Sequence, residues 1–184
     1  LESIETNFSG CKESVKILEL LTALIAERKE NPASVKGAIE FDPMKLFALK
    51  GKFDKGMEAA FATAKELIEK SRDLPVFRTL MVDGSIFHNS GSDISQELAF
   101  NLAAGVEYLS KLNEAGLEAA EISKNMKFNF AVGSNYFMEI AKLRAARMLW
   151  AKIVKAYGTA DEKACQMEIH SVNSSWNKTL FDPY

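Results

Sequence analysis

The sequence predicts an α/β fold of parallel strand–helix units, and two observations lead to this expectation. Short extended runs recur about every 35 to 50 residues, and each is followed by one or more segments with helical periodicity. About five units fit into 184 residues, whereas a closed eight-stranded barrel usually takes about 250. The pattern therefore leaves two architectures open, an open doubly wound sheet and about five-eighths of a barrel.

The first two strands are expected at residues 2–8 and 37–41. Ser9-Gly10 ends the first, and apolar residues at helical spacing predict a helix over about 13–28 that Asn31-Pro32 stops. Asp42-Pro43 ends the second strand and begins a short helix. A stronger helix is expected over about 54–72, with Asp54 as its N-cap.

The remaining strands are expected at residues 77–82, 127–132 and 166–172. The third leads into a loop rich in glycine, serine and asparagine at 83–93, then a long helix over about 94–114 that Gly116 closes. The fourth breaks at residues 133–135 into the most regular helix, about 136–156. Its expected buried face is formed by residues at spacings of three and four: Phe137, Ile140, Leu143, Ala146, Leu149, Trp150 and Ile153.

The charge composition limits the classes of partner that this chain is expected to bind. With 23 Lys+Arg and 25 Asp+Glu the net charge is −2, and the basic residues are interspersed with acidic ones. No extended positive face is expected, so neither nucleic acid nor a membrane surface is favoured as a partner. No apolar run approaches the ~20 residues of a membrane-spanning helix, and the first residues lack the features of a signal peptide, so a cytoplasmic location is predicted.

The two cysteines and the ends of the chain carry little chemistry. Cys11 and Cys165 belong to no CxxC or Cys/His cluster, so no metal site is indicated and both are interpreted as small buried residues. The chain opens in a strand-like run and stops as new structure should begin. We interpret it as a piece of a longer protein.

In both candidate folds function resides in the loops after the strands, near Asp42 and residues 84–93, 133–135 and 171–176. The turn after the first strand, SGCK, matches neither GxGxxG nor GxxxxGK[ST], so no nucleotide-phosphate loop is predicted. His88 and His170 could serve as general bases at this end, although packed or loop histidines are the favoured interpretation. Glu40 and Asp42 could pair in acid/base chemistry or bind a metal, but an N-capping role for Asp42 is favoured.

One further cluster of charge lies on the helix at 136–156. Lys142, Arg144 and Arg147 could form a basic stripe that binds an anion. Because Glu139 lies one turn away, a solvated face is the favoured interpretation. From periodicity and spacing alone, no catalytic group can be identified.

Three segments carry a specific resemblance. Residues 135–150, NYFMEIAKLRAARMLW, closely resemble the NFFMEIAKxRAARxLW segment of methylmalonyl-CoA mutases. Residues 96–100, QELAF, resemble the family's VQELAF, and residues 37–45, GAIEFDPMK, resemble its GTIQNDPLKE. The similarity extends over essentially the whole chain.

The resemblance implies a fold and a reaction. It implies a partial TIM (β/α)8 barrel of about five parallel βα units, with residues 1–184 a fragment of the substrate-binding barrel domain and the cobalamin-binding domain not included. In this family an adenosylcobalamin-dependent radical rearrangement interconverts succinyl-CoA and methylmalonyl-CoA inside the barrel. Adenosylcobalamin is thus expected in the holoenzyme and not on this fragment.

The family's substrate-contacting positions are mostly replaced here. Its GYHxxEAGA loop corresponds to residues 84–92, GSIFHNSGS, so Ser85 stands for the tyrosine and Ile86 for the histidine that would bond the thioester carbonyl. The glutamine of GTIQND is Glu40. The arginine that would clamp the substrate carboxylate is Lys50, which lacks a bidentate fork.

The fifth departure lies in the last expected strand, where the glutamine of the family's HTQTSGW stretch falls on Val172. Five replaced positions beside a nearly identical helix resemble the small, non-catalytic subunit of heterodimeric bacterial mutases. The implied partners are a large catalytic subunit and, in the holoenzyme, acyl-CoA; no catalytic residue is assigned to this chain. The alternative is an active acyl-CoA mutase with an altered substrate range, and the exposed edges of a partial barrel predict that the fragment self-associates.

Overall fold

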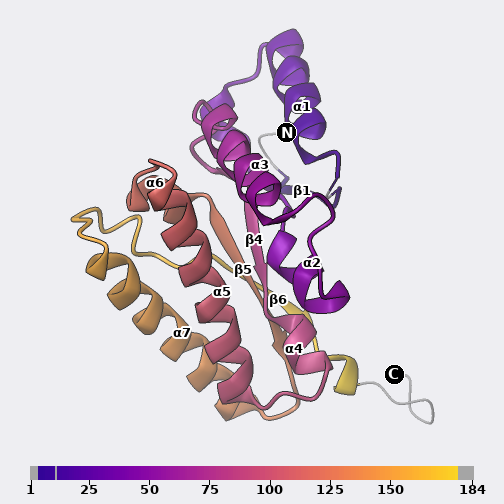
Figure 1. Cartoon of the computed structure of the whole chain (residues 1–184), viewed down its shortest axis with the longest axis vertical. Coiled ribbons are helices and arrows are strands. Elements are labelled where there is room, and N and C mark those ends of the chain that lie inside the picture. The colour runs from indigo at the N-terminus through magenta and orange to yellow at the C-terminus, as the bar shows by residue number, and fades with distance from the viewer. Residues whose placement is uncertain (1–3, 11, 178–184) are drawn as a thin grey trace.

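The computed structural model describes residues 4–10 and 12–177 as a parallel α/β fold. Figure 1 shows its helices packed along the outer side of strands that all run in one direction. The sheet residues are β1 (Thr6–Phe8), β2 (Gly37–Ile39), β3 (Phe77–Arg78), β4 (Leu80–Asp83), β5 (Met126–Val132) and β6 (Ile169–Asn173).

The strands are adjacent in chain order, as the sequence predicts. One sheet has the order β1-β2-β3 and the other β4-β5-β6, and every pair is parallel. The order does not reverse within either sheet, as it does in a doubly wound sheet. The parallel α/β class is therefore confirmed, whereas closure into a barrel stays a prediction.

The expected third strand is divided, and its two parts join the two sheets. Thr79 lies between β3 and β4, where the amides of Thr79 and Leu80 both donate to the carbonyl of Asn125. Just beyond it, the Met81 amide donates to the Phe41 carbonyl at 3.1 Å, so β4 also contacts the end of β2. The sheets consequently act as one curved surface.

Side-chain contacts show that this surface is concave. Phe128 packs against Trp150 of a helix at 4.6 Å between ring centroids, so its neighbours Lys127 and Asn129 face the opposite side. There Lys127 pairs with Glu5 and donates to Asn7 of β1 at 3.3 Å. Strands that are not neighbours thus meet across the concave side, as they would in a barrel.

The helices follow the expected periodicity, with two additions. They are α1 (Ser14–Arg28), α2 (Pro43–Lys50), α3 (Met57–Lys70), α4 (Ser85–Asn89), α5 (Ile94–Glu114), α6 (Ala119–Lys124) and α7 (Tyr136–Ala156), with 3₁₀ turns η1 (Pro32–Ser34) and η2 (Ser175–Asn177). The helices at 94–114 and 136–156 are confirmed. Residues 85–89, expected in a loop, form α4, and α6 was not predicted.

Two element boundaries were wrong. The helix expected from Asp54 begins at Met57, because Gly56 adopts φ 88° before it, and Asp54 instead pairs with Lys12 at 3.4 Å. The last strand begins at Ile169 rather than 166, since turns at residues 162–166 use the backbone amides there. The first strand begins at Thr6, and the first three residues lie outside the described ones.

The expected buried face of α7 was also wrong at its first turns. Phe137 is 80% exposed and Ile140 40%, while Glu139 and Lys142 are buried. The interpretation of Lys142 and Glu139 as part of a solvated face is thereby overturned. Farther along the helix, Ala146 and Trp150 are buried as predicted.

The remaining expectations concern the cysteines and membrane-spanning helices. Cys165 is buried as predicted, and Cys11 lies outside the described residues. Across residues 4–10 and 12–177, no helix is both long and apolar enough to cross a membrane.

Candidate functional site

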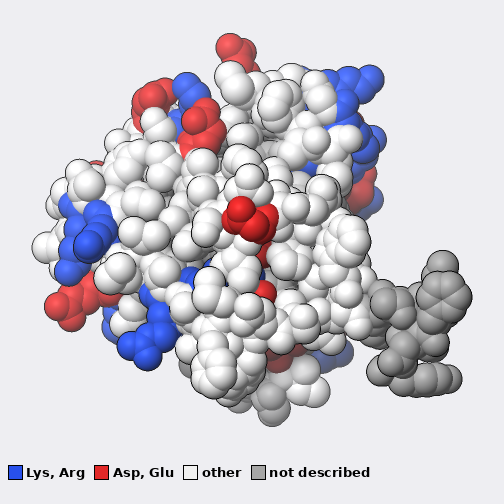
Figure 2. All heavy atoms as spheres, turned by 90° about the horizontal axis from the view of Figure 1, so that it is seen from below, with Lys and Arg blue, Asp and Glu red and all other residues white. Residues whose placement is uncertain are grey.

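The carboxyl ends of the strands carry a cluster of polar side chains on the concave side. The cluster comprises Glu40, Asp42, Lys45, Asp83, Ser85 and Asn129, with Tyr108 reaching in from α5. Figure 2 looks onto this end of the molecule, where acidic side chains appear near the centre and Lys and Arg lie mainly toward the edges. Parallel strands bring these residues together because their carboxyl ends share one edge of the sheet.

Asp42 is the most highly connected member. It is the N-cap of α2, as predicted, and accepts from the Lys45 amide at 2.9 Å. The Tyr108 hydroxyl donates to the same oxygen at 2.8 Å, and the Asp83 amide donates to the other at 2.8 Å. Desolvation by burial outweighs these hydrogen bonds and raises the pKa of Asp42 from 3.8 to about 6.

Asp83 is the second centre of the cluster. The Lys45 ammonium lies 2.6 Å from one of its oxygens, while the Ser85 hydroxyl and the Asn129 side-chain amide donate to the other at 2.6 and 2.8 Å. Burial works to raise the pKa of Asp83, but these donors hold it below its usual value. Burial likewise opposes the charge of Lys45, and contact with Asp83 raises its pKa.

These residues surround a pocket of about 140 Å³, which we call the polar pocket. Its lining residues are Ser9, Glu40, Asp42, Lys45, Leu46, Met81, Asp83 and Asn129. Three carboxylates and one ammonium face it. The amide oxygen of Asn129 is buried and has no hydrogen-bond partner among the residues that the structure describes.

The five positions expected from the resemblance do not all meet here. Glu40 lines the polar pocket and Ser85 adjoins it through Asp83. Ile86 lines an adjoining, mainly apolar groove with Phe87 and Phe100, and this groove shares Asp42, Lys45 and Asp83 with the polar pocket. Lys50 is exposed at the last residue of α2. Val172 lies half-buried on β6 opposite Ala131.

A second polar network, missed from the sequence, lies where α5 and α7 meet β5. Glu97 accepts from the Ala131 amide at 2.7 Å and pairs with Lys142 at 2.6 Å, and both side chains are fully buried. Lys142 also donates to the Ala131 carbonyl and pairs with Glu139, which accepts from the Gly133 amide. In the sequence these residues are acidic and basic positions within regular helical periodicity, a pattern that is also typical of a solvated helix face.

His88 belongs to the edge of that network. Its Nε2 lies 2.8 Å from the Ser174 hydroxyl and its Nδ1 3.5 Å from Glu97, an order that resembles a nucleophile, base and carboxylate. However, the amide of Trp176 donates to Ser174 and that of Ser175 to Asn89, so neither is available to stabilise an oxyanion. The contacts therefore tie η2 to α4, while His170 is exposed on β6 rather than packed.

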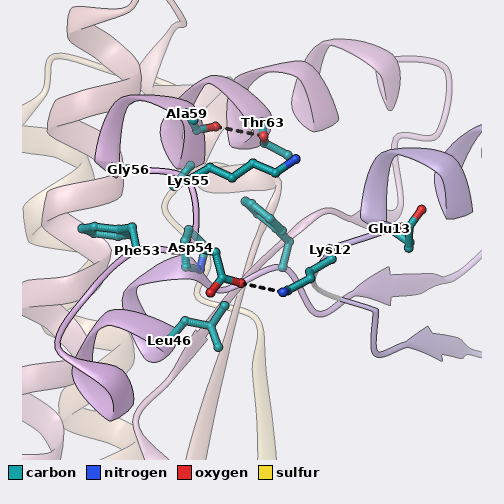
Figure 3. A pocket seen from close by; sticks show the side chains of 12 residues that line it. Lys12, Glu13, Leu46, Phe53, Asp54, Lys55, Gly56, Ala59 and Thr63 are labelled. Atoms are coloured by element: carbon teal, nitrogen blue, oxygen red, sulfur yellow. Dashed lines mark hydrogen bonds and ion pairs between the residues drawn. The ribbon is translucent and has the colours of Figure 1, made fainter.

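Another pocket, of about 340 Å³, lies between α2 and the start of α3 (Figure 3). Its apolar lining residues include Phe41, Leu46 and Phe53. Lys12 and Lys55 are balanced by Glu13 and Asp54, and Figure 3 shows the pairing of Lys12 with Asp54. This pocket therefore offers no net charge to select an ionic ligand.

The described side chains form no evident metal site. Within residues 4–10 and 12–177, no group of three or more His, Cys, Asp or Glu side chains could hold a metal ion. The carboxylates of Asp42 and Asp83 instead accept hydrogen bonds from backbone amides and hydroxyl groups, and Asp83 also pairs with Lys45.

Comparison with known proteins identifies relatives over the whole chain. The family model described as methylmalonyl-CoA mutase matches residues 1–184. The chain is 37% identical to the methylmalonyl-CoA mutase small subunit of Porphyromonas gingivalis, over 100% of this chain and 30% of that protein. It is 33% identical to the large subunit from the same organism, over 91% of this chain and 24% of the relative.

A third relative is the methylmalonyl-CoA mutase large subunit of Propionibacterium freudenreichii subsp. shermanii, 31% identical over 99% of this chain and 25% of that protein. The chain thus spans less than a third of the length of these curated relatives.

Removing the cation of the buried network should be costly. We expect Lys142→Met to lower the free energy of unfolding by about 3–5 kcal/mol, because Glu97 and Glu139 are left buried without their counter-ion. Adding Glu97→Gln should recover part of the loss. Urea denaturation measures both, and the exposed Lys152→Met on the same helix serves as control; equal losses for the two lysines would contradict the assignment.

Asp42 should make the protein less stable as the pH rises, which is opposite to the usual effect of a carboxylate in a folded protein. Its pKa is raised to about 6 by burial, so between about pH 4 and 6 the folded chain holds a proton that the unfolded chain releases. Protonation of Asp42 therefore contributes about 3 kcal/mol to the free energy of unfolding below pH 4, and this contribution is lost as the pH rises through 6.

The measurement is the free energy of unfolding of the parent protein and of Asp42→Asn across that range. The variant is expected to be less stable overall, because the NH2 group that replaces one carboxylate oxygen cannot accept, so either the Asp83 amide or the Lys45 amide and Tyr108 hydroxyl lose their acceptor. The difference between the two proteins should narrow as pH rises. A constant difference would show that Asp42 titrates normally.

Proposed function

Because the chain belongs to the methylmalonyl-CoA mutase family, we propose that residues 1–184 are part of the substrate-binding barrel domain of a small, non-catalytic mutase subunit. The proposal rests mainly on the resemblance, which places Glu40, Lys50, Ser85, Ile86 and Val172 at positions where the family has its substrate-contacting residues. The greater identity to a small subunit than to the large subunit of the same organism supports the assignment.

The charges of the polar pocket support a non-catalytic role for this chain. The family's substrates carry a carboxylate, which the carboxylates of Glu40, Asp42 and Asp83 would repel. Lys45 is already held 2.6 Å from Asp83, and Lys50 is exposed rather than in the pocket. Ile86 has no donor for a thioester oxygen.

The cofactor is proposed to belong to the holoenzyme and not to this segment. Adenosylcobalamin supplies the radical chemistry of the family. Of the two histidines, His88 is engaged at Nε2 by Ser174, and His170 is exposed near the start of β6. We propose that this segment performs no chemical step itself and supports a large catalytic subunit, in the cytoplasm.

A second candidate is an active mutase with an altered substrate range. It is favoured by one observation, that Glu40 and Ser85 lie at the same end of the sheet and could contact a different acyl group. The two functions differ in whether the subunit turns over substrate without a partner.

The full-length subunit alone, supplied with adenosylcobalamin, is expected to consume no succinyl-CoA above background. Ile86→His with Val172→Gln should restore little activity, because donors that act together are strongly non-additive. Further addition of Ser85→Tyr, Lys50→Arg and Glu40→Gln is needed for any recovery. The exposed Arg147→Lys is the control, and substantial turnover by the unmodified subunit would favour the altered-range enzyme.

We also propose that the 184-residue chain self-associates. Within the described sheets, β1 pairs only with β2 and β6 only with β5, so each offers unpaired backbone groups to another strand. Sedimentation equilibrium should reveal dimers or larger species. Val172→Lys, which adds a charge to the edge strand β6, should weaken association, while a monomer at all micromolar concentrations would contradict the proposal.

A further inference from the structure

The outward side of α7 carries a stripe of exposed apolar and basic residues, which we call the α7 stripe. Its members recur at spacings of three and four along the helix: Phe137, Ile140, Arg144, Arg147 and Met148. Phe137, Arg144 and Met148 each lie two positions before a buried residue, which is a rotation of about 200° around the helix. The α7 stripe therefore points away from the sheet, at the outer edge of the molecule (Figure 1).

The charge on this side of α7 is not balanced. Four exposed residues of the helix are basic: Arg144, Arg147, Lys152 and Lys155. None of them pairs with a carboxylate among the described residues, and Glu139, the one acidic residue of α7, is buried beside Lys142. In a chain whose net charge is −2, this side of α7 is a local concentration of positive charge. The surface that complements it is acidic.

The first half of α7 also exposes the residue types of protein–protein interfaces. Tyr, Phe, Met and Arg are enriched in the cores of such interfaces, whereas Lys is depleted there. Phe137 is 80% exposed, Tyr136 70% and Met148 55%. The lysines come later in the helix, at 152 and 155. This order is typical of an interface core over the first half of α7 with a basic rim beyond it.

Three other occupants fit the α7 stripe less well. Two copies of this chain that met through α7 would place like charges opposite each other. A helix that inserts into a membrane surface needs a wholly apolar side, whereas Arg144 lies between Ile140 and Met148 in the stripe. A following βα unit would pack beside α7 and against the sheet, as α5 does, and not over its outward side.

We propose that the α7 stripe docks onto an acidic surface of the large catalytic subunit, with carboxylates opposite Arg144 and Arg147 and an apolar recess for Phe137. The inference rests on the proposed function, because it takes the large subunit as the partner. Arginine binds a carboxylate through two parallel N–H groups, and an exposed phenylalanine gains free energy when its ring is removed from water. Because exposed charge pairs are screened by salt, the association weakens as ionic strength rises.

The first test uses the unmodified full-length protein. Met148 on α7 and Met57 on α3 are exposed to similar extents, 55% and 45%. The protein is treated with dilute hydrogen peroxide, alone and with the purified large subunit, and the sulfoxide at each methionine is measured by mass spectrometry. We expect Met148 to be oxidised several-fold more slowly in the complex, while Met57 is oxidised at an unchanged rate.

The second test measures affinity by calorimetry. Arg144→Glu and Phe137→Ala should each weaken binding of the large subunit at least about tenfold. Matched controls are Lys16→Glu and Leu20→Ala, which change exposed residues of α1 at the opposite end of the molecule and should bind as the parent does. Circular dichroism establishes that the variants are folded, and the methionine measurement tests the surface even if a variant does not fold.

The outcomes separate this inference from the proposed function. If the two unmodified subunits do not associate, both fail. If they associate but Met148 stays unprotected, or folded Arg144→Glu and Phe137→Ala bind as tightly as the parent, the inference alone is overturned.

Three further results would overturn the inference by identifying another occupant. If Met148 is unreactive in the free full-length protein, the rest of its own chain covers the stripe. Protection that appears when the protein alone is concentrated would assign the stripe to a second copy. Protection by phosphatidylserine vesicles and not by the large subunit would assign it to a membrane surface.

Discussion

Asp42 is the constraint on which the arrangement of the strand ends depends. One carboxylate begins α2, receives the amide of Asp83 at the end of β4 and receives the hydroxyl of Tyr108 from α5. It therefore connects the first sheet to the second and to the outer helices. The energetic cost of burying this carboxylate appears as its raised pKa, and three donors offset only part of it.

The Asp42 contacts also position the other side chains of the polar pocket. Because Asp42 positions the Asp83 backbone, Asp83 can hold Lys45, Ser85 and Asn129 at the same time. The Lys45 ammonium is thereby paired with Asp83 at the edge of the polar pocket.

The network of Glu97 and Lys142 has a different role. It joins α5 and α7 to the end of β5, and it turns the first residues of α7 so that Phe137 and Ile140 face solvent. Burying an ion pair rarely adds stability over apolar packing, but it specifies geometry because a shifted helix would leave both charges unpaired. The exposure of these two apolar residues is a consequence of that orientation.

The sequence by itself determined the parallel βα order, the spans of α5 and α7 and the N-cap at Asp42, because periodicity and capping are local. It also carried the family resemblance, which the family model bears out over residues 1–184. It could not reveal that Lys142 and Glu139 are buried, that residues 85–89 are helical, or that α3 begins at Met57.

These features were decided by tertiary structure. Charged residues on a helix indicate a solvated face from sequence alone, and the burial of Lys142 depends on Glu97, which lies 45 positions away in the chain. A glycine-rich segment likewise indicates a loop, whereas here the Gly84 amide donates to the Asn129 carbonyl just before α4. The polar pocket likewise exists only because curvature of the sheet brings Ser9, Glu40, Asp83 and Asn129 together. No local pattern encodes a contact between residues that distant, since its free energy depends on burial and geometry that the folded chain alone supplies.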